Sequence, residues 1–285
     1  MEYKNSTLAT TTSPFLKGIG QIMLQDNIWT GLFFLAGIFC GSSTMGLAAI
    51  LAVVTGTYTA KLLKYPSDEI NSGLYGFSAT LVGVALIIYF QPTITIWLAI
   101  VIGSILATMI QHFFIVKKIP AYTFPFILVT WLCLFITYKL PFLTEPPALT
   151  SDLLVNHQLS TLPLAFGQVI FQNSIWSGIL FFAGVLINRP IAAIYALVAA
   201  ALSGFIAYSL GEPTKDIYLG LLSYNAVLCA ITFAGKKIED FVLALIAVVL
   251  AVIIMSLMRS MNLPALTFPF VLASWIVILL KKIKR

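Results

Sequence analysis

The chain has 285 residues, of which 60% are hydrophobic and 9% are charged, and its formal net charge is +6. Soluble domains carry about a quarter charged residues and somewhat under half apolar ones, so this composition excludes soluble globular, disordered and nucleic-acid-binding proteins. The mean hydropathy of +1.01 instead predicts an all-α integral membrane protein embedded in the lipid bilayer, which is its first expected partner.

The N-terminal segment and the cysteines narrow the class further. The first 13 residues are polar and rich in Thr and Ser, without the basic and apolar regions of a signal peptide, so we expect no cleaved leader. Cys40, Cys133 and Cys229 lie singly in apolar stretches. This spacing favours reduced thiols over a disulfide framework or a metal cluster, and we expect neither a metal nor a cofactor.

Apolar stretches of about 20 residues, the length of a helix that crosses a bilayer, recur along the chain. In the first half, the predicted spans are 28–45, 46–63, 71–90, 93–114 and 119–138. In the second half, they are 174–188, 190–209, 217–234, 240–258 and 263–280. The sequence therefore predicts ten transmembrane helices in two groups of five, with an irregular connecting loop over 139–160 that carries prolines and charges.

The two groups of spans repeat each other. Residues 21–37 match 168–184 at an offset of 147, with 8 of 17 positions identical, and residues 119–131 match 263–275 at an offset of 144, with 8 of 13 identical. Because five spans are an odd number, the second group must enter the membrane in the opposite orientation. We therefore predict two inverted five-helix repeats around a central pore. Their expected bounds are 14–138 and 161–280.

The basic residues indicate how the chain is oriented. If the N-terminus is cytoplasmic, 13 of the 16 Lys and Arg residues fall in inner segments, and only Lys139, Lys215 and Arg259 fall in outer ones. This asymmetry follows the positive-inside rule. It predicts a multi-pass protein of the cell membrane with both termini in the cytoplasm, and it explains the net charge without a nucleic-acid or acidic partner.

The cores of the ten predicted spans contain no Asp, Glu, Lys or Arg. An ion-coupled carrier normally keeps an ionisable ligand at membrane depth, so this pattern favours passive passage of a neutral solute. It also argues against an enzyme, because no acid–base pair or metal cluster is available. The alternative is a proton-coupled carrier, for which His112 is the ionisable candidate near membrane depth. A non-transporting scaffold or receptor subunit is a third possibility.

A repeated segment, Pro-Ala-x-Thr-Phe-Pro-Phe, begins at Pro120 and at Pro264 and places Thr123 and Thr267 at membrane depth. A proline inside a helix clashes with the carbonyl four residues back, so Pro125 and its counterpart are predicted to free a carbonyl beside each threonine. Bare carbonyls are tolerated at this depth where they face protein or a water-filled cavity. Two symmetric copies favour a pore-lining role over kinked packing helices with Thr bonded to its own backbone.

Short amphipathic stretches over 14–27 and 161–173 precede the first span of each group. They are too short and too polar to cross a membrane alone, so we expect short re-entrant or in-plane helices. Each stretch places a glutamine three residues before a large apolar side chain on the same helix face: Gln21 before Leu24, and Gln168 before Phe171.

The third span of each group carries an aromatic residue one turn before a leucine. These pairs are Phe77 with Leu81 and Tyr224 with Leu228. Such a stripe alone is typical of a packed core, whereas beside the paired glutamines and threonines it can form the flat wall of a slot. Acceptor oxygens and flat walls together predict a small, neutral, planar, amide-like solute.

At these residues the sequence resembles the urea transporter family. Residues 73–83, Gly-Leu-Tyr-Gly-Phe-Ser-Ala-Thr-Leu-Val-Gly, are similar to the family's G-L-Y-G-(F/Y)-N-x-x-L-V-G signature, and the twin Pro-x-x-Thr-x-Pro-Phe elements look like its L-P-x-x-T-x-P-F repeats. The resemblance covers residues 14–280. It implies a homotrimer with one pore per protomer that passes urea down its gradient. Ser78 departs from the family's Asn, which Asn225 restores in the second half.

The resemblance also implies roles for individual residues. The family pattern implies an oxygen ladder that accepts urea N–H bonds in single file, formed by Gln21, Thr123, Gln168 and Thr267. It implies apolar slot walls formed by Leu24, Phe77, Leu81, Val169, Phe171, Tyr224 and Leu228. Such a lining replaces the hydration of the solute in small steps, so that no site binds tightly enough to stall transit.

Overall fold

The computed structural model describes residues 7–140 and 161–283, and every regular element within these ranges is a helix. The helices of the first half are α1 (Thr7–Gly20), α2 (Ile28–Gly41), α3 (Ser43–Leu62), α4 (Ser67–Asn71), α5 (Phe77–Tyr89), α6 (Ile94–Val116) and α7 (Phe124–Lys139). Those of the second half are α8 (Thr161–Gly167), α9 (Ile175–Asn188), α10 (Pro190–Ser209), α11 (Thr214–Tyr218), α12 (Tyr224–Phe233), α13 (Ile238–Ser260) and α14 (Phe268–Ile283). Short 3₁₀ turns, η1 (Gln21–Met23) and η4 (Gln168–Ile170), follow α1 and α8. The predicted connecting loop lies outside the described residues from 141 onward.

Four helices, α3, α6, α10 and α13, are long and apolar enough to cross a membrane. Two more spans arise if each bent pair counts as one, because the α1 and α2 segments meet at 75° and the α8 and α9 segments at 80°. The apolar helices α5, α7 and α12 are shorter, with 10–17 residues, and α14 has 16. These helices are those of a multi-pass membrane protein, and ten full-length spans stay a prediction.

The third predicted span of each half is not one continuous helix. It begins at the end of a short helix, α4 or α11, and the main helix starts only at Phe77 in α5 and at Tyr224 in α12. A glycine turn precedes each start. Gly73 and Gly220 have φ angles of +77° and +73°, a region that glycine enters without steric cost. A Cβ on Gly73 would lie 2.3 Å from the backbone nitrogen of Gly18. The turn therefore packs against the backbone of α1 and fixes where α5 starts.

The starts of α7 and α14 show that one expectation was wrong. Because α7 begins at Phe124, Pro125 lies in its first turn, where the missing N–H costs no hydrogen bond. The carbonyl of Ala121 accepts a bond from the N–H of Phe124 at 3.0 Å, and that of Ala265 accepts one from the N–H of Phe268 at 3.0 Å. The prolines therefore begin the two helices and do not free these carbonyls.

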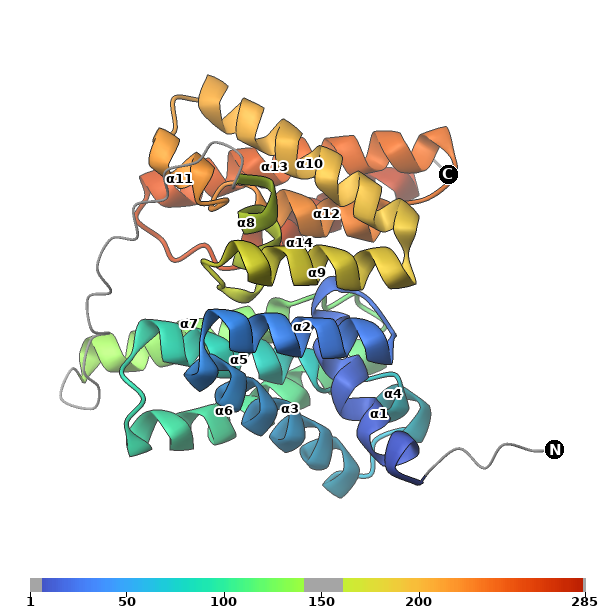
Figure 1. Cartoon of the computed structure of the whole chain (residues 1–285), viewed down its shortest axis with the longest axis vertical. Coiled ribbons are helices and arrows are strands. Elements are labelled where there is room, and N and C mark those ends of the chain that lie inside the picture. Colours follow the sequence, from blue (N-terminus) through green and yellow to red (C-terminus); the bar gives the residue numbers. More distant parts are fainter. Residues whose placement is uncertain (1–6, 141–160, 284–285) are drawn as a thin grey trace.

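The two halves meet along α2 and α9, which lie side by side across the middle of the molecule (Figure 1). The hydroxyl of Thr30 donates to the carbonyl of Gly184 at 2.7 Å. The hydroxyl of Ser177 donates to the carbonyl of Gly37, also at 2.7 Å. Thr30 and Ser177 differ by 147 positions, as do Gly37 and Gly184. Each half therefore makes the same contact to the other.

The core and the outer surface are both apolar. At the α2–α9 contact, the buried rings of Phe34 and Phe181 meet edge to face, with centroids 5.3 Å apart. Large apolar side chains on the long helices, including Ile94, Phe205 and Leu257, are well exposed. An apolar exterior of this extent is suited to lipid rather than to water.

Candidate functional site

Thr123 and Thr267 come together in the interior. Their hydroxyl oxygens are 2.6 Å apart and both side chains are buried. Each threonine directly precedes a helix, α7 or α14, and follows a residue with a positive φ: +47° at Tyr122 and +46° at Leu266. Bulky residues rarely adopt this conformation, which costs roughly 1–3 kcal/mol. A matched, strained turn thus precedes each of the two hydroxyls.

Residues 120–126 and 264–270, which contain Thr123 and Thr267, are called the threonine segments. The first residue of each segment accepts a hydrogen bond from an indole group of the opposite half. Trp131 Nε1 donates to the carbonyl of Pro264 at 2.8 Å, and Trp275 Nε1 donates to the carbonyl of Pro120 at 2.8 Å. The two tryptophans differ by 144 positions, and so do the two prolines. Because each bond joins α7 or α14 to the other segment, the pair fixes the position of one threonine relative to the other.

The second threonine segment is also held by α12. The Tyr224 hydroxyl and Asn225 Nδ2 both donate to the carbonyl of Leu266, the amide at 3.2 Å, and Asn225 Oδ1 accepts from the N–H of Phe270 at 3.0 Å. In the first half, Ser78 takes the place of Asn225, and its buried hydroxyl has no hydrogen-bond partner among the described residues. The two segments are therefore held unequally.

A pocket of about 310 Å³ lies beside the second threonine segment. It brings together three of the residues that the sequence singled out: Gln168, Phe171 and Tyr224. The remaining lining residues are mostly apolar: Ile88, Tyr89, Leu221, Met255, Arg259, Leu263, Ala265 and Leu266. This mixture of a carboxamide, aromatic rings and aliphatic side chains is typical of a small-molecule site.

Arg259 is the one charged residue in the described lining of this pocket, and the sequence interpretation did not assign it there. Its guanidinium is ion-paired with Asp216, and its Nε lies 3.6 Å from Glu212. Two carboxylates thus offset the single positive charge of the arginine at the pocket wall. The outer position of Arg259 was visible in the sequence, but its pairing depends on how α11 packs against α13.

The glutamine-bearing stretches form tight turns rather than continuous helix faces. Leu24 and Phe171 follow η1 and η4 with φ angles of +60° and +57°. Their N–H groups bond the carbonyls of Gln21 and Gln168 at 3.0 and 3.2 Å. The two glutamine side chains lie differently. Gln21 Nε2 donates to the carbonyl of Ser72 at 2.9 Å, whereas Gln168 lines the pocket.

The other predicted wall residues lie within the core. Phe77, Leu81, Val169 and Leu228 are all buried in the main hydrophobic cluster, and none of them lines the pocket. Leu24 packs against the same cluster while remaining partly exposed. The structure therefore places three predicted residues at the pocket, joins the two threonines to each other, and buries four of the others in the hydrophobic core.

His112 belongs to a separate polar cluster. Its Nδ1 lies 2.8 Å from the hydroxyl of Tyr75, and its ring stacks on Tyr65 with centroids 3.6 Å apart. The Tyr75 hydroxyl also bonds the carboxylate of Glu69. None of these residues lines the pocket.

The described parts of the chain, 7–140 and 161–283, contain no group of three His, Cys, Asp or Glu residues placed to hold a metal ion. Cys40, Cys133 and Cys229 are all free thiols, as their spacing predicted.

Comparison with known proteins gives a consistent match over this whole architecture. A family model described as "Urea transporter" matches residues 12–282. The chain is 28% identical over 290 residues to "Urea transporter 1" of Rattus norvegicus, an alignment that covers 93% of this chain and 76% of the relative. The proteins of the same name from Mus musculus and Capra hircus are 26% and 27% identical, with the same coverage.

Proposed function

Because the chain belongs to the urea transporter family, we propose that it conducts urea passively across the cell membrane, down the concentration gradient of urea. It is a transporter and not an enzyme. The observation that carries the passive mechanism is the neutral pair of buried hydroxyls, Thr123 and Thr267, next to a pocket lined by Gln168. These groups accept hydrogen bonds from N–H donors and carry no charge of their own.

The proposed path leads from the pocket to the threonine pair. Urea enters beside Gln168, whose side-chain oxygen accepts an N–H bond, while Phe171 and Tyr224 flank its flat faces. At the narrowing, the Thr123 and Thr267 hydroxyls exchange their mutual bond for bonds to urea. Each exchange replaces one hydrogen bond by another, so every step is small and none traps the solute.

Beyond the threonines, the proposed path continues toward Gln21. The side-chain nitrogen of Gln21 is engaged by the carbonyl of Ser72, which leaves its oxygen as the acceptor for urea. Gln21 is the fourth acceptor of the ladder, after Gln168, Thr123 and Thr267.

The apolar wall of the slot, or the core layer that supports it, is assigned to Leu24, Phe77, Leu81, Val169 and Leu228.

The charges favour this passive route over the proton-coupled alternative. The one charge in the described pocket lining, Arg259, is paired with carboxylates. His112, the candidate for proton coupling, bonds Tyr75 and stacks on Tyr65 instead of lining the pocket. A coupled carrier needs a titratable group on the solute path.

We further propose that residues 14–138 and 161–280 form two inverted repeats whose axis passes the threonine pair, with ten membrane-crossing or half-crossing segments and both termini in the cytoplasm. Reciprocal hydrogen bonds at offsets of 147 and 144 support this symmetry. The asymmetric placement of Lys and Arg supports the orientation. A homotrimer with one pore per protomer follows from the family resemblance.

Solute permeabilities of proteoliposomes test this function. Stopped-flow light scattering should show urea entering protein-containing vesicles much faster than protein-free ones, while glycerol enters both at similar rates. Gln168→Leu should lower the urea rate, because it removes an acceptor from the pocket. Gln91→Leu is the matched control, since Gln91 lies in the α5–α6 connection and outside the pocket lining. Equal urea rates with and without protein would overturn the proposal.

A further inference from the structure

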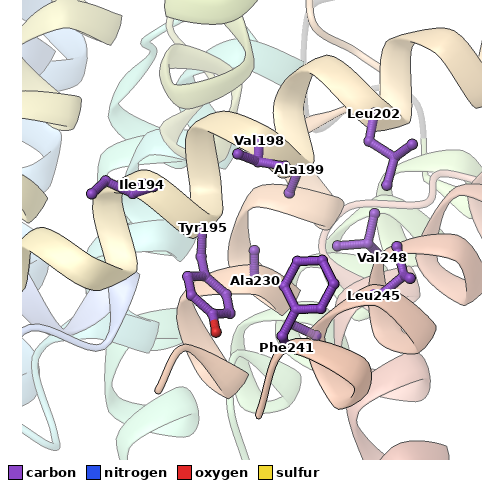
Figure 2. Close-up of a pocket in the computed structure, with 10 residues that line it drawn as sticks. Ile194, Tyr195, Val198, Ala199, Leu202, Ala230, Phe241, Leu245 and Val248 are labelled. Atoms are coloured by element: carbon purple, nitrogen blue, oxygen red, sulfur yellow. The ribbon is translucent and has the colours of Figure 1, made fainter. Parts of the chain in front are cut away.

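A second hollow lies away from the proposed urea path. It is an apolar groove of about 160 Å³ between α10 and α13, and α12 contributes Ala230 to it (Figure 2). Small side chains, Ala199 and Ala244 among them, leave the space open. The rings of Tyr195 and Phe241 meet edge to face at one end, with centroids 6.2 Å apart.

Basic residues surround the end of the groove where these two rings meet. Tyr195 and Phe241 both lie within the first two turns of their helices, so α10 and α13 begin at the same end of the groove. Arg189 directly precedes α10, and Lys236 and Lys237 directly precede α13. Three cationic side chains are therefore placed at the mouth of an apolar groove.

Two hydrogen bonds hold the α12–α13 loop at this mouth. The Tyr195 hydroxyl donates to the carbonyl of Gly235 at 3.0 Å, and Arg189 Nη2 donates to the carbonyl of Ala234 at 3.3 Å. The guanidinium keeps further N–H donors for a ligand, and Lys236 and Lys237 are exposed. The bonds thus fix the basic residues next to the groove.

The acidic residues nearby leave this mouth positive. Asp240 accepts a bond from the backbone N–H of Lys237 at 3.1 Å, so it caps α13. Glu239 is the other carboxylate in the first turn of α13. Three basic side chains thus outnumber two acidic ones, and none of the three is in a salt bridge identified among residues 7–140 and 161–283.

We propose that this groove binds an anionic phospholipid, with one acyl chain between α10 and α13 and the phosphate between Arg189, Lys236 and Lys237. The apolar walls suit the acyl chain. The basic mouth suits the phosphate, as in basic pockets between membrane helices. On the proposed orientation, this mouth faces the cytoplasmic leaflet.

The first half offers a natural comparison for this site. The positions that the repeat pairs with Arg189, Lys236 and Lys237 are Ser42, Pro92 and Thr93, at offsets of 147 and 144. None of these three carries a charge. The lipid site therefore belongs to one half only.

Native mass spectrometry of the purified protein in detergent tests the proposal directly. Phosphatidylglycerol should bind more tightly than phosphatidylcholine with the same chains. The triple variant Arg189→Gln/Lys236→Gln/Lys237→Gln should weaken phosphatidylglycerol binding roughly 10- to 100-fold. It should weaken phosphatidylcholine binding much less, because that headgroup carries no net charge, and so abolish the preference. The matched control removes three basic residues that the proposed topology places on the same side of the membrane: Lys64→Gln/Lys117→Gln/Lys118→Gln. This control variant should still bind phosphatidylglycerol more tightly than phosphatidylcholine.

A second variant tests the groove with the charges intact. Ala244→Leu fills the space between the helices and should lower retention of phosphatidylglycerol, whereas Leu257→Ala on the exposed surface of α13 should not. A triple variant that keeps the full preference would overturn the proposal. Cross-linking of protomers through Leu245→Cys, in a background without Cys40, would also overturn it, because the groove would then be a subunit interface. Neither readout measures urea flux.

Discussion

The hydroxyl of Thr123 lies 2.6 Å from that of Thr267, and the two residues are separated by 144 positions. Each buried hydroxyl finds its hydrogen-bond partner in its own counterpart from the other half. In the proposed inverted repeat, a two-fold axis relates the two residues, and residues related in this way can touch only near the axis. The contact therefore places the proposed narrowing of the urea path where the two halves meet.

The threonine pair predicts an unusual pattern of stabilities. Thr123→Val leaves the Thr267 hydroxyl buried without this partner and should lower the free energy of unfolding by about 1–3 kcal/mol. The double variant Thr123→Val/Thr267→Val removes both hydroxyls and should cost less than the sum of the two single variants. Denaturant unfolding in detergent measures the three values. Additive losses would show that the two hydroxyls do not interact.

The same double variant should conduct urea poorly. Losing two acceptors worth about 1 kcal/mol each raises the barrier enough to slow urea roughly 30-fold. Thr137→Val is the matched control, because the Thr137 hydroxyl bonds only carbonyls of its own helix, those of Cys133 and Leu134. Stopped-flow urea permeability should fall in the double variant alone. A double variant as permeable as the unmodified protein would remove the threonines from the path.

Asn225 and Ser78 should respond differently to truncation although they occupy equivalent positions. Asn225→Ala removes the bonds to Leu266 and Phe270 and should cost about 2–3 kcal/mol of stability. Ser78→Ala should be nearly neutral, because its hydroxyl has no partner among the described residues. Thermal unfolding of the two variants measures the difference. Equal losses would contradict the unequal support of the two threonine segments.

Trp131 and Trp275 should contribute equally to the free energy of unfolding. Replacing either indole by phenylalanine removes one reciprocal hydrogen bond and should cost about 0.5–1.5 kcal/mol beyond the effect of lost ring area. Trp97→Phe controls for that area, since Trp97 on α6 is also partly buried against the hydrophobic core. Unfolding free energies should be lowered alike at 131 and 275. A large loss at one position only would argue against symmetric anchoring.

His112 should have no part in urea conduction. His112→Gln should leave urea permeability unchanged at every pH between about 6 and about 8, because His112 bonds Tyr75 outside the pocket. Proteoliposomes buffered at each pH provide the measurement. A pH-dependent flux that the substitution abolishes would instead support the proton-coupled alternative.

The sequence predicted which residues are equivalent, because the repeats align at fixed offsets. It could not predict that Thr123 and Thr267 touch, since residues 144 positions apart are joined only by packing of the two halves. The same holds for Trp131 and the carbonyl of Pro264. The free carbonyl expected beside Thr123 was wrong because an apolar run does not show where a helix starts, so Pro125 was placed inside a helix and not in its first turn. Tertiary contacts set that start at Phe124.

The spans were predicted best where one long helix is present. The predicted 190–209 coincides with α10, whereas 217–234 contains the end of α11, a glycine turn and the short α12. Hydropathy averages over a window and does not register a break at a single residue such as Gly220. The role of Arg259 at the pocket was missed for a related reason, since its partner Asp216 lies on another helix.

Passive conduction is tested most directly by urea flux under an imposed proton gradient. Radiolabelled urea added outside the proteoliposomes should enter until its concentrations inside and outside are equal. A protonophore should change neither the rate of entry nor this final level. Accumulation of urea above its equilibrium level that a protonophore abolishes would contradict passive conduction and establish a coupled carrier.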